Sequence, residues 1–165
     1  MYSNCYSRAY QAIISEIVRC AEKYDYLERS VKLNQREQKS YLSLLQRDMN
    51  DQTLSESLLT LSKLLEKHHG QKVIILIDEY DVPLAKAFDY GYYDQMVLLI
   101  RKLLSYCLKS NTSLQFAVLT SCMRISKESI FTGLNNLEVF SISDVYFEES
   151  FGFTDSEVRK MLVTL

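Results

Sequence analysis

Glycine and proline are scarce in this chain of 165 residues, which contains four glycines and one proline. The first glycine is Gly70, so no glycine-rich segment precedes it. A phosphate-cradling loop of the GxxxxGK[ST] type needs glycines because its backbone N–H groups must close around phosphate oxygens. The sequence contains no such loop and cannot bind phosphate in that way.

Paired cysteines are also absent. The four cysteines are scattered along the chain, at Cys5, Cys20, Cys107 and Cys122. They form no CxxC pair and have no histidine partner at the spacing of zinc ligands. This pattern excludes a disulfide framework or a zinc motif and predicts reduced, mostly buried thiols of a cytoplasmic protein.

Neither sign of charge dominates, and no apolar run is long. The chain has 19 basic and 21 acidic residues and a net charge of −2, which offers no overall attraction for nucleic acid or an anionic membrane. The longest apolar runs have the length of a strand, and the N-terminus lacks the layout of a signal peptide. We therefore expect a soluble protein with no membrane partner.

Three amphipathic helices are predicted before Gly70. Apolar residues recur at helical spacing over 6–27 and 35–49, and a third pattern follows the link 50–53, where Thr53 and Glu56 have the spacing of a capping box. His68 and His69 fall in the last turn, and adjacent residues on a helix do not easily share a metal. We interpret the apolar stripes as core, although a leucine-rich face that docks a partner stays open.

The chain is organised around a short apolar run, VIILI at 73–77, that ends in Asp78 and Glu79. Five consecutive apolar residues predict a strand that is buried on both faces, as in the centre of a parallel sheet. Ligands collect at the carboxyl ends of such strands, so both carboxylates are candidates for chemistry. An alternative interpretation is a buried strand that leaves the sheet through a solvated acidic turn.

A helix over 94–109 and a second apolar run over 114–120 complete a strand–helix–strand unit. If the two strands are parallel neighbours, Thr120 lies at the same edge as Asp78 and Glu79. Ser121 and Arg124 follow. In a nucleotide site, a hydroxyl beside a carboxylate pair orients the attacking water or the γ-phosphate, and a guanidinium offsets the negative charge of that phosphate. The alternative is a polar loop in which Arg124 is solvated or paired.

A third strand is predicted over 137–142, and a closing helix begins near Thr154, with Glu157 completing a capping box. The helical pattern reaches Leu165 without a Gly, Asn or Pro stop signal. We therefore expect the domain to continue beyond this residue.

Several stretches in the same order carry a resemblance to a known family: LIDEYDVPL at 76–84, GYY at 91–93, ISKESIFTGLNN at 125–136 and FGFT at 151–154. Together they resemble the bacterial AAA-ATPase-like family, whose members often carry a PD-(D/E)XK nuclease-like domain further along the chain. The resemblance is dense from about residue 71 to the end and weak before it.

The resemblance implies an α/β fold: a partial P-loop NTPase core of the ASCE/AAA-like type, with three layers and a parallel sheet. Residues 1–165 would form a single partial domain, with a helical segment over 1–70 and the Walker B and sensor βαβ core over 71–165. By position, Asp78 would hold Mg²⁺ and Glu79 would be the catalytic carboxylate for ATP hydrolysis. The resemblance also implies that Thr120 or Ser121 would be the sensor and that Arg124 would contact the γ-phosphate. Ser121 and Asp81 would contact the nucleotide.

This sequence departs from the family at two places. Ser121 stands where the family usually has Gly, and the Walker A loop is missing. We therefore interpret the chain as the C-terminal part of an ATPase-like domain that begins after its first two strands, either a fragment or a truncated gene product. Alone, it is expected to bind neither Mg²⁺ nor ATP and to have no ATPase activity. Nucleic acid would be a partner only through a nuclease-like domain outside this chain.

Two other functions stay open. The first is a non-enzymatic assembly module that self-associates or recruits a protein through open sheet edges. The second takes Asp78, Glu79 and Asp81 as a carboxylate metal cluster for phosphodiester hydrolysis. The second ranks last because alternation along an extended strand puts Glu79 opposite the other two carboxylates, and no Lys completes a D…ExK pattern.

Overall fold

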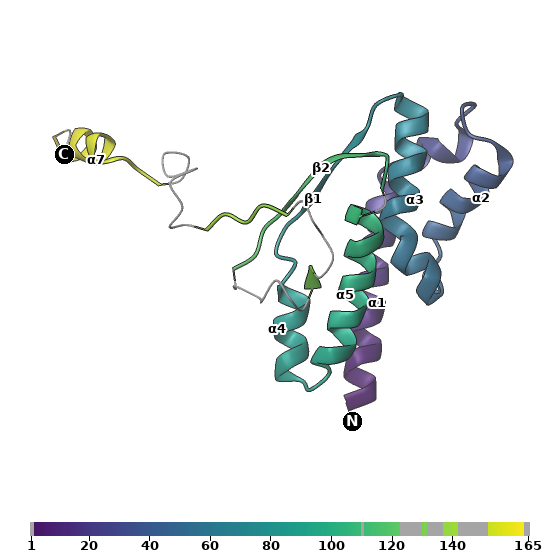
Figure 1. The fold of residues 1–165 in the computed structure, drawn as a ribbon, viewed down its shortest axis with the longest axis horizontal. Helices are drawn as coiled ribbons and strands as arrows, with labels where there is room; N and C mark the ends of the chain where they lie inside the picture. The colour runs from purple at the N-terminus through teal and green to yellow at the C-terminus, as the bar shows by residue number, and fades with distance from the viewer. Residues whose placement is uncertain (1, 110, 123–129, 132–136, 142–151, 164–165) are drawn as a thin grey trace. The chain divides into compact units, whose positions relative to one another are not determined.

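The computed structural model describes residues 2–109, 111–122, 130–131, 137–141 and 152–163. The chain divides into two compact units, residues 1–134 and 135–165. The described part is a mostly helical α/β protein with a two-stranded parallel sheet (Figure 1). In chain order the elements are α1 (Tyr2–Glu22), η1 (Asp25–Arg29), α2 (Gln35–Leu44), α3 (Asp51–His69), β1 (Val73–Ile77), α4 (Val82–Asp89), α5 (Tyr93–Lys109), β2 (Leu114–Leu119) and α7 (Asp155–Val163).

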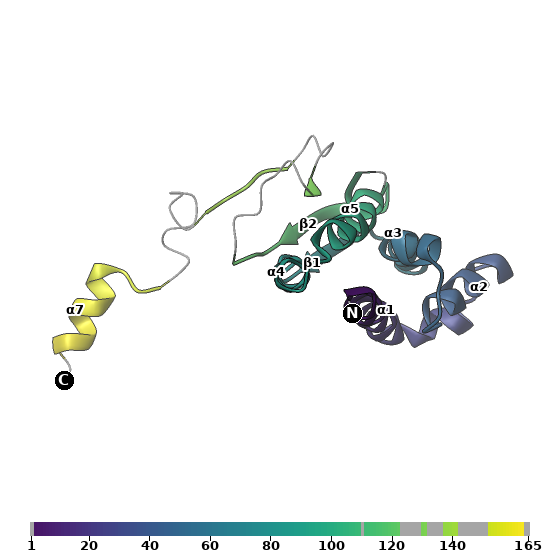
Figure 2. The same ribbon diagram turned by 90° about the horizontal axis from the view of Figure 1, so that it is seen from below.

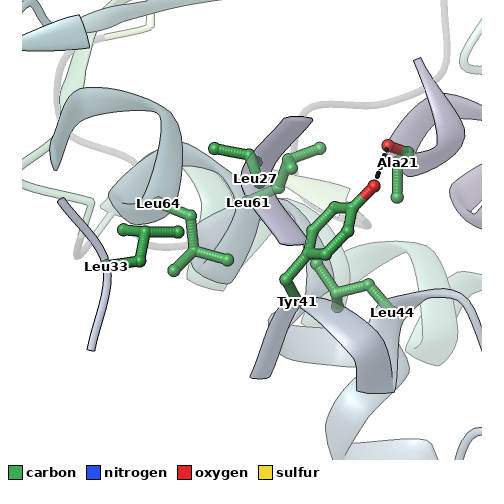
Figure 3. Packing of buried hydrophobic residues seen from close by; sticks show 7 residues of the cluster. All are labelled: Ala21, Leu27, Leu33, Tyr41, Leu44, Leu61 and Leu64. Carbon is green, nitrogen blue, oxygen red and sulfur yellow. Dashed lines mark hydrogen bonds between the residues drawn. The ribbon is translucent and has the colours of Figure 1, made fainter. Parts of the chain in front are cut away.

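The N-terminal helices bury their apolar stripes against one another, as the sequence predicts. Figure 3 shows the core that they share with η1, made by Ala21, Leu27, Leu33, Tyr41, Leu44, Leu61 and Leu64. The hydroxyl of Tyr41, which is fully buried, donates a hydrogen bond of 3.0 Å to the carbonyl of Ala21. This bond satisfies the one polar atom that the ring brings into the core.

The boundaries of these helices differ from the predicted ones. The first helix ends at Glu22 instead of residue 27, and a 3₁₀ turn, η1, follows it. The second ends at Leu44 instead of residue 49. The third starts at Asp51 because the side chain of Asn50 accepts the N–H of Thr53 at 2.8 Å, so the capping role predicted for Thr53 is wrong.

The C-terminus of α3 follows the prediction. His68 and His69 occupy its last turn, and Gly70 ends the helix in the left-handed conformation, with φ of 72°. Glycine suits this position because it has no Cβ to clash with the backbone.

The two strands run parallel, and α5 lies between them in the chain. Ile74 pairs with Phe116, and the register continues to Ile77 opposite Leu119. α3 packs against β1 and α5 against β2, and α3 and α5 also pack against each other. Figure 2 shows α5 beside both strands. The predicted parallel strand–helix–strand unit is therefore confirmed.

One face of this sheet is open, which corrects the prediction that its first strand is buried on both faces. Ile74 and Leu76 are 50% and 74% exposed, and their partners Phe116 and Val118 are 48% and 47% exposed. The physical reason is that α3 and α5 cover the other face, toward which Ile75 and Ile77 are turned. An apolar run alone does not tell whether one face or both are covered.

The unit formed by residues 135–165 is described at 137–141 and 152–163. Residues 137–141 form no strand, and Ile142, the end of the predicted third strand, lies outside the described residues. α7 begins as predicted: the N–H of Thr154 donates to the Glu157 carboxylate at 2.8 Å, and the N–H of Glu157 donates to the Thr154 hydroxyl at 3.4 Å. None of the α7 side chains is buried.

Within the described part of the chain, no helix combines the length and the apolar character that crossing a membrane requires.

Candidate functional site

The parallel register brings the ends of β1 and β2 together at one edge of the sheet. Because Ile77 pairs with Leu119, the next residues, Asp78 and Thr120, are neighbours. The Thr120 N–H donates to the Ile77 carbonyl at 2.9 Å, and the Thr120 carbonyl accepts from Tyr80 N–H at 3.1 Å. The backbone pairing therefore continues past both strands and fixes the turn that carries the two carboxylates.

The hydroxyl of Thr120 joins both acidic residues. It accepts a hydrogen bond from the backbone N–H of Glu79 at 3.1 Å and donates one to Oδ1 of Asp78. Asp78, Glu79 and Thr120 are all exposed. The hydrogen bond holds one carboxylate oxygen of Asp78, and a carboxylate has further lone pairs available for a cation.

Glu79 adopts an uncommon backbone conformation. Its φ is 52°, and within the described part of the chain no other residue except glycine has a positive φ. This left-handed region is disfavoured for residues with a Cβ and occurs frequently at functional sites. The bond from its N–H to Thr120 stabilises this turn.

Asp81 lies in a different environment from Asp78 and Glu79. It is 2% exposed and precedes α4, where its carbonyl accepts from the N–H groups of Leu84 and Ala85 at 3.0 and 2.9 Å. The described residues contain no group of three His, Cys, Asp or Glu side chains that could hold a metal ion. The interpretation of Asp78, Glu79 and Asp81 as one metal cluster is therefore wrong.

Phe131 packs against Tyr80 in the acidic turn. Ile130 and Phe131 are buried, and the Phe131 ring lies 5.3 Å from the Tyr80 ring in an edge-to-face arrangement. Sequence reasoning did not assign this contact. The signal was two adjacent apolar residues, one of them aromatic, directly after the polar run SKES at 126–129.

The structure brings together three of the predicted site residues, Asp78, Glu79 and Thr120. Ser121 follows Thr120 directly and is exposed. Arg124, the candidate for a γ-phosphate contact, lies outside the described residues. The roles of all these residues stay predictions.

The carboxylates at this edge suit Mg²⁺, but no loop of backbone N–H groups that could bind phosphate accompanies them in this sequence. Magnesium usually uses one or two protein carboxylates and completes its coordination with waters and substrate phosphates. The exposed Asp78, beside Glu79, meets that need at the end of β1. The loop of backbone donors that phosphates require is absent from the sequence.

An acidic turn at the carboxyl edge of a parallel strand pair is the kind of place where α/β proteins bind nucleotides. The chain belongs to the AAA-ATPase-like family, since the family model described as "Predicted AAA-ATPase" matches residues 6–131. The match begins at residue 6 and therefore includes the N-terminal helices as well as the site. These helices lie before the stretches that carry the resemblance.

A protein of Azotobacter chroococcum mcd 1, named "Uncharacterized protein in vnfD 5'region", is 30% identical to this chain over 110 residues. The alignment covers 64% of this chain and 21% of that protein, so the chain matches about a fifth of the length of its relative. No solved structure matches the chain.

Proposed function

We propose that this chain carries the metal- and water-handling part of a Mg²⁺-dependent ATPase site. Asp78 would hold the ion, Glu79 would polarise the attacking water, and Thr120 would keep both residues in place. When bound, Mg²⁺ would neutralise charge on the phosphates. The observation that carries the proposal is the Thr120 hydroxyl, which bonds both Asp78 and the backbone of Glu79.

The proposed site is incomplete within residues 1–165. Phosphate binding needs backbone donors arranged around the β- and γ-oxygens, and a strand end with two carboxylates repels these oxygens unless a cation lies between them. We therefore propose that ATP binds only when a glycine-rich loop outside this chain is present. In such a longer protein, hydrolysis would drive a change in an attached domain, for which a nuclease-like domain is our candidate.

Calorimetry with MgATP tests this proposal on residues 1–165 and on a longer form that includes any upstream glycine-rich loop. We expect binding only in the longer form, and Asp78→Asn should abolish its magnesium dependence. Asp89→Asn is the matched control because Asp89 is an exposed carboxylate at the end of α4, outside the acidic turn. Glu79→Gln should keep binding and lose hydrolysis. Micromolar ATP affinity in residues 1–165 would contradict the proposal.

A second function, assembly with another copy of this chain, is favoured by the open sheet face. Ile74, Leu76, Phe116 and Val118 form a contiguous apolar surface. Parallel sheets are normally covered on both faces. In a dimer with two-fold symmetry, this face would pack against the same face of a second copy. The four side chains would then be buried in both copies.

Light scattering of the purified chain tests this second function. We expect a dimer at micromolar concentration that Leu76→Lys converts to a monomer. Leu98→Lys is the matched control, since Leu98 is a 55% exposed leucine on α5. A monomer in the unchanged chain, or equal loss of the dimer in both variants, would exclude assembly through this face.

A further inference from the structure

A polar and aromatic cluster surrounds both histidines of the chain at the C-terminal end of α3. The Tyr26 hydroxyl lies 2.8 Å from Nε2 of His69, and the Ser30 hydroxyl lies 2.8 Å from Nδ1 of His68. The Tyr26 ring is 4.9 Å from the His68 ring, and the two imidazoles are 4.7 Å apart. Lys32 completes the cluster by donating to the His68 carbonyl at 2.5 Å.

This cluster connects the segment 25–33 to the end of α3. Leu27 and Leu33 anchor the segment in the core below. Three backbone bonds of this segment are the Leu27 N–H to the Tyr24 carbonyl at 2.9 Å, the Ser30 N–H to the Leu27 carbonyl at 3.3 Å and the Leu33 N–H to the Ser30 carbonyl at 3.2 Å. Gln38 of α2 also donates to the Ser30 carbonyl at 3.2 Å, whereas the side-chain bonds of Tyr26 and Ser30 to the histidines are those that join the segment to α3.

The surroundings of His68 disfavour its protonation, first through burial and then through neighbouring groups. Partial burial, the neighbouring His69 and the Lys32 ammonium all lower the pKa of His68 from its ordinary value of 6.5. No carboxylate of the described residues is among the groups that act on the pKa of His68: on α2, Glu37 pairs with Lys67 of α3 at 2.6 Å, and on η1, the charge of Asp25 helps to raise the pKa of Tyr26. The negative end of the α3 dipole offsets part of this effect on His68.

We propose that this cluster is an acid-released clasp. Neutral His68 holds the segment 25–33 on the end of α3, and protonation of His68 loosens that segment. Protonation places a positive charge beside the Lys32 ammonium and against the His69 ring, while the hydrogen bond to Ser30 offers only a neutral hydroxyl in return. Gly70, Gln71 and Lys72 lead directly from the clasp into β1, so the clasp lies at the junction of the helical segment and the sheet.

The direction of the pH dependence follows from the lowered pKa. The open form binds a proton near pH 6.5, and the closed form binds it only at lower pH. The clasp is therefore at full strength above pH 6.5 and weakens as the pH falls through the pKa of the closed form.

Hydrogen exchange measures the opening directly. Protection factors of the Ser30 and Leu33 amides, corrected for intrinsic exchange, should fall several-fold between pH 7.5 and pH 5.5. The Leu103 and Leu104 amides of α5 serve as the internal reference and should keep their protection. An equal fall in α5 would mean global unfolding and would overturn the proposal.

Two variants separate His68 from other titrating groups. His68→Gln keeps a planar polar side chain that cannot gain a charge in this range, so the pH dependence at Ser30 and Leu33 should disappear. Lys32→Met removes a cation, so the midpoint of release should move to higher pH. Unchanged pH dependence in the folded His68→Gln variant, or an unmoved midpoint in Lys32→Met, would overturn the proposal.

An NMR titration gives an independent measurement. The chain has two histidines, so its imidazole signals are few, and His69→Gln assigns them. We expect the pKa of His68 to lie below 6.5. A value at or above 6.5 would remove the physical basis of the clasp.

Discussion

Thr120 is the residue on which the geometry of the acidic turn depends. Its N–H, carbonyl and hydroxyl bond Ile77, Tyr80, Glu79 and Asp78, which covers the whole turn after β1. A threonine fits because its backbone continues the strand pairing while its side chain reaches the neighbouring residues. The same residue therefore contributes to the fold and orders the proposed site.

Replacing Thr120 by valine tests this dual contribution. Valine keeps the shape but loses the bonds to Glu79 and Asp78. Because the site is exposed and water can replace a partner, we expect a loss of about 1 kcal/mol in the free energy of unfolding. Chemical denaturation measures this loss. Thr120→Ser, which keeps the hydroxyl, should lose clearly less, and equal losses in both variants would show that the hydroxyl bonds contribute nothing.

Cys107 should make the free energy of unfolding depend on pH under alkaline conditions. Burial raises the pKa of this thiol from 9.0 to about 12. Above pH 9 the unfolded chain loses the proton and the folded chain keeps it, so the folded state binds more protons. This difference lowers stability as the pH rises from about 9 toward 12.

The slope of stability between pH 8.5 and pH 10.5 should therefore be shallower in Cys107→Ala than in the unchanged chain. The comparison concerns slopes, because the alanine also leaves a cavity that lowers stability at every pH. Cys122→Ala is the control, since its side chain is exposed in the fold. Equal slopes in all three proteins would contradict the assignment of the alkaline loss to Cys107.

At the scale of the elements, the start of α3 shows what the sequence can and cannot predict. Asn50 and Thr53 are both good capping residues, and three positions separate them. The choice of Asn50 adds residues 51–53 to the helix, and α3 then brings Asp51 to Lys102 of α5 in an ion pair of 2.9 Å. The helix pattern was predictable, but the choice between two local caps depends on packing between helices.

Alanine substitution at the two positions distinguishes them. Asn50→Ala should lower the free energy of unfolding by about 1 kcal/mol, because the Thr53 N–H loses its acceptor. Thr53→Ala should cost little, since its N–H keeps the bond to Asn50 and alanine favours a helix. Thermal or chemical denaturation measures both. A larger loss for Thr53→Ala would mean that the helix begins at the predicted cap.

The sheet shows the same division between local and tertiary information. The apolar runs predicted both strands, and their parallel pairing predicted that Asp78, Glu79 and Thr120 share one edge. The exposure of Leu76 and Val118 was not predictable, because it depends on which face α3 and α5 cover. The contact of Tyr80 with Phe131 joins positions far apart in the chain, and no local pattern gives such a pairing.

At the scale of the whole molecule, the core lies in the first unit. All described hydrophobic residues that are buried fall between Ile14 and Phe131, and the second unit contributes α7, whose side chains are all exposed. Buried apolar area is the main favourable term in folding. The first unit therefore contains the described residues that supply this term.

Residues 1–134 should accordingly fold on their own, with a cooperative thermal transition. We expect a midpoint within about 2–4 °C of that of the full chain, the shift that corresponds to about 1 kcal/mol in a protein of this size. Residues 1–113 are the control, because they lack β2 and Thr120. Without β2, β1 has lost its paired strand, and without Thr120 the turn at Asp78 has lost its hydrogen bonds to that residue. That shorter chain should not give a cooperative transition. A large loss of stability in residues 1–134 would show that residues 135–165 contribute buried area that the exposed α7 does not account for.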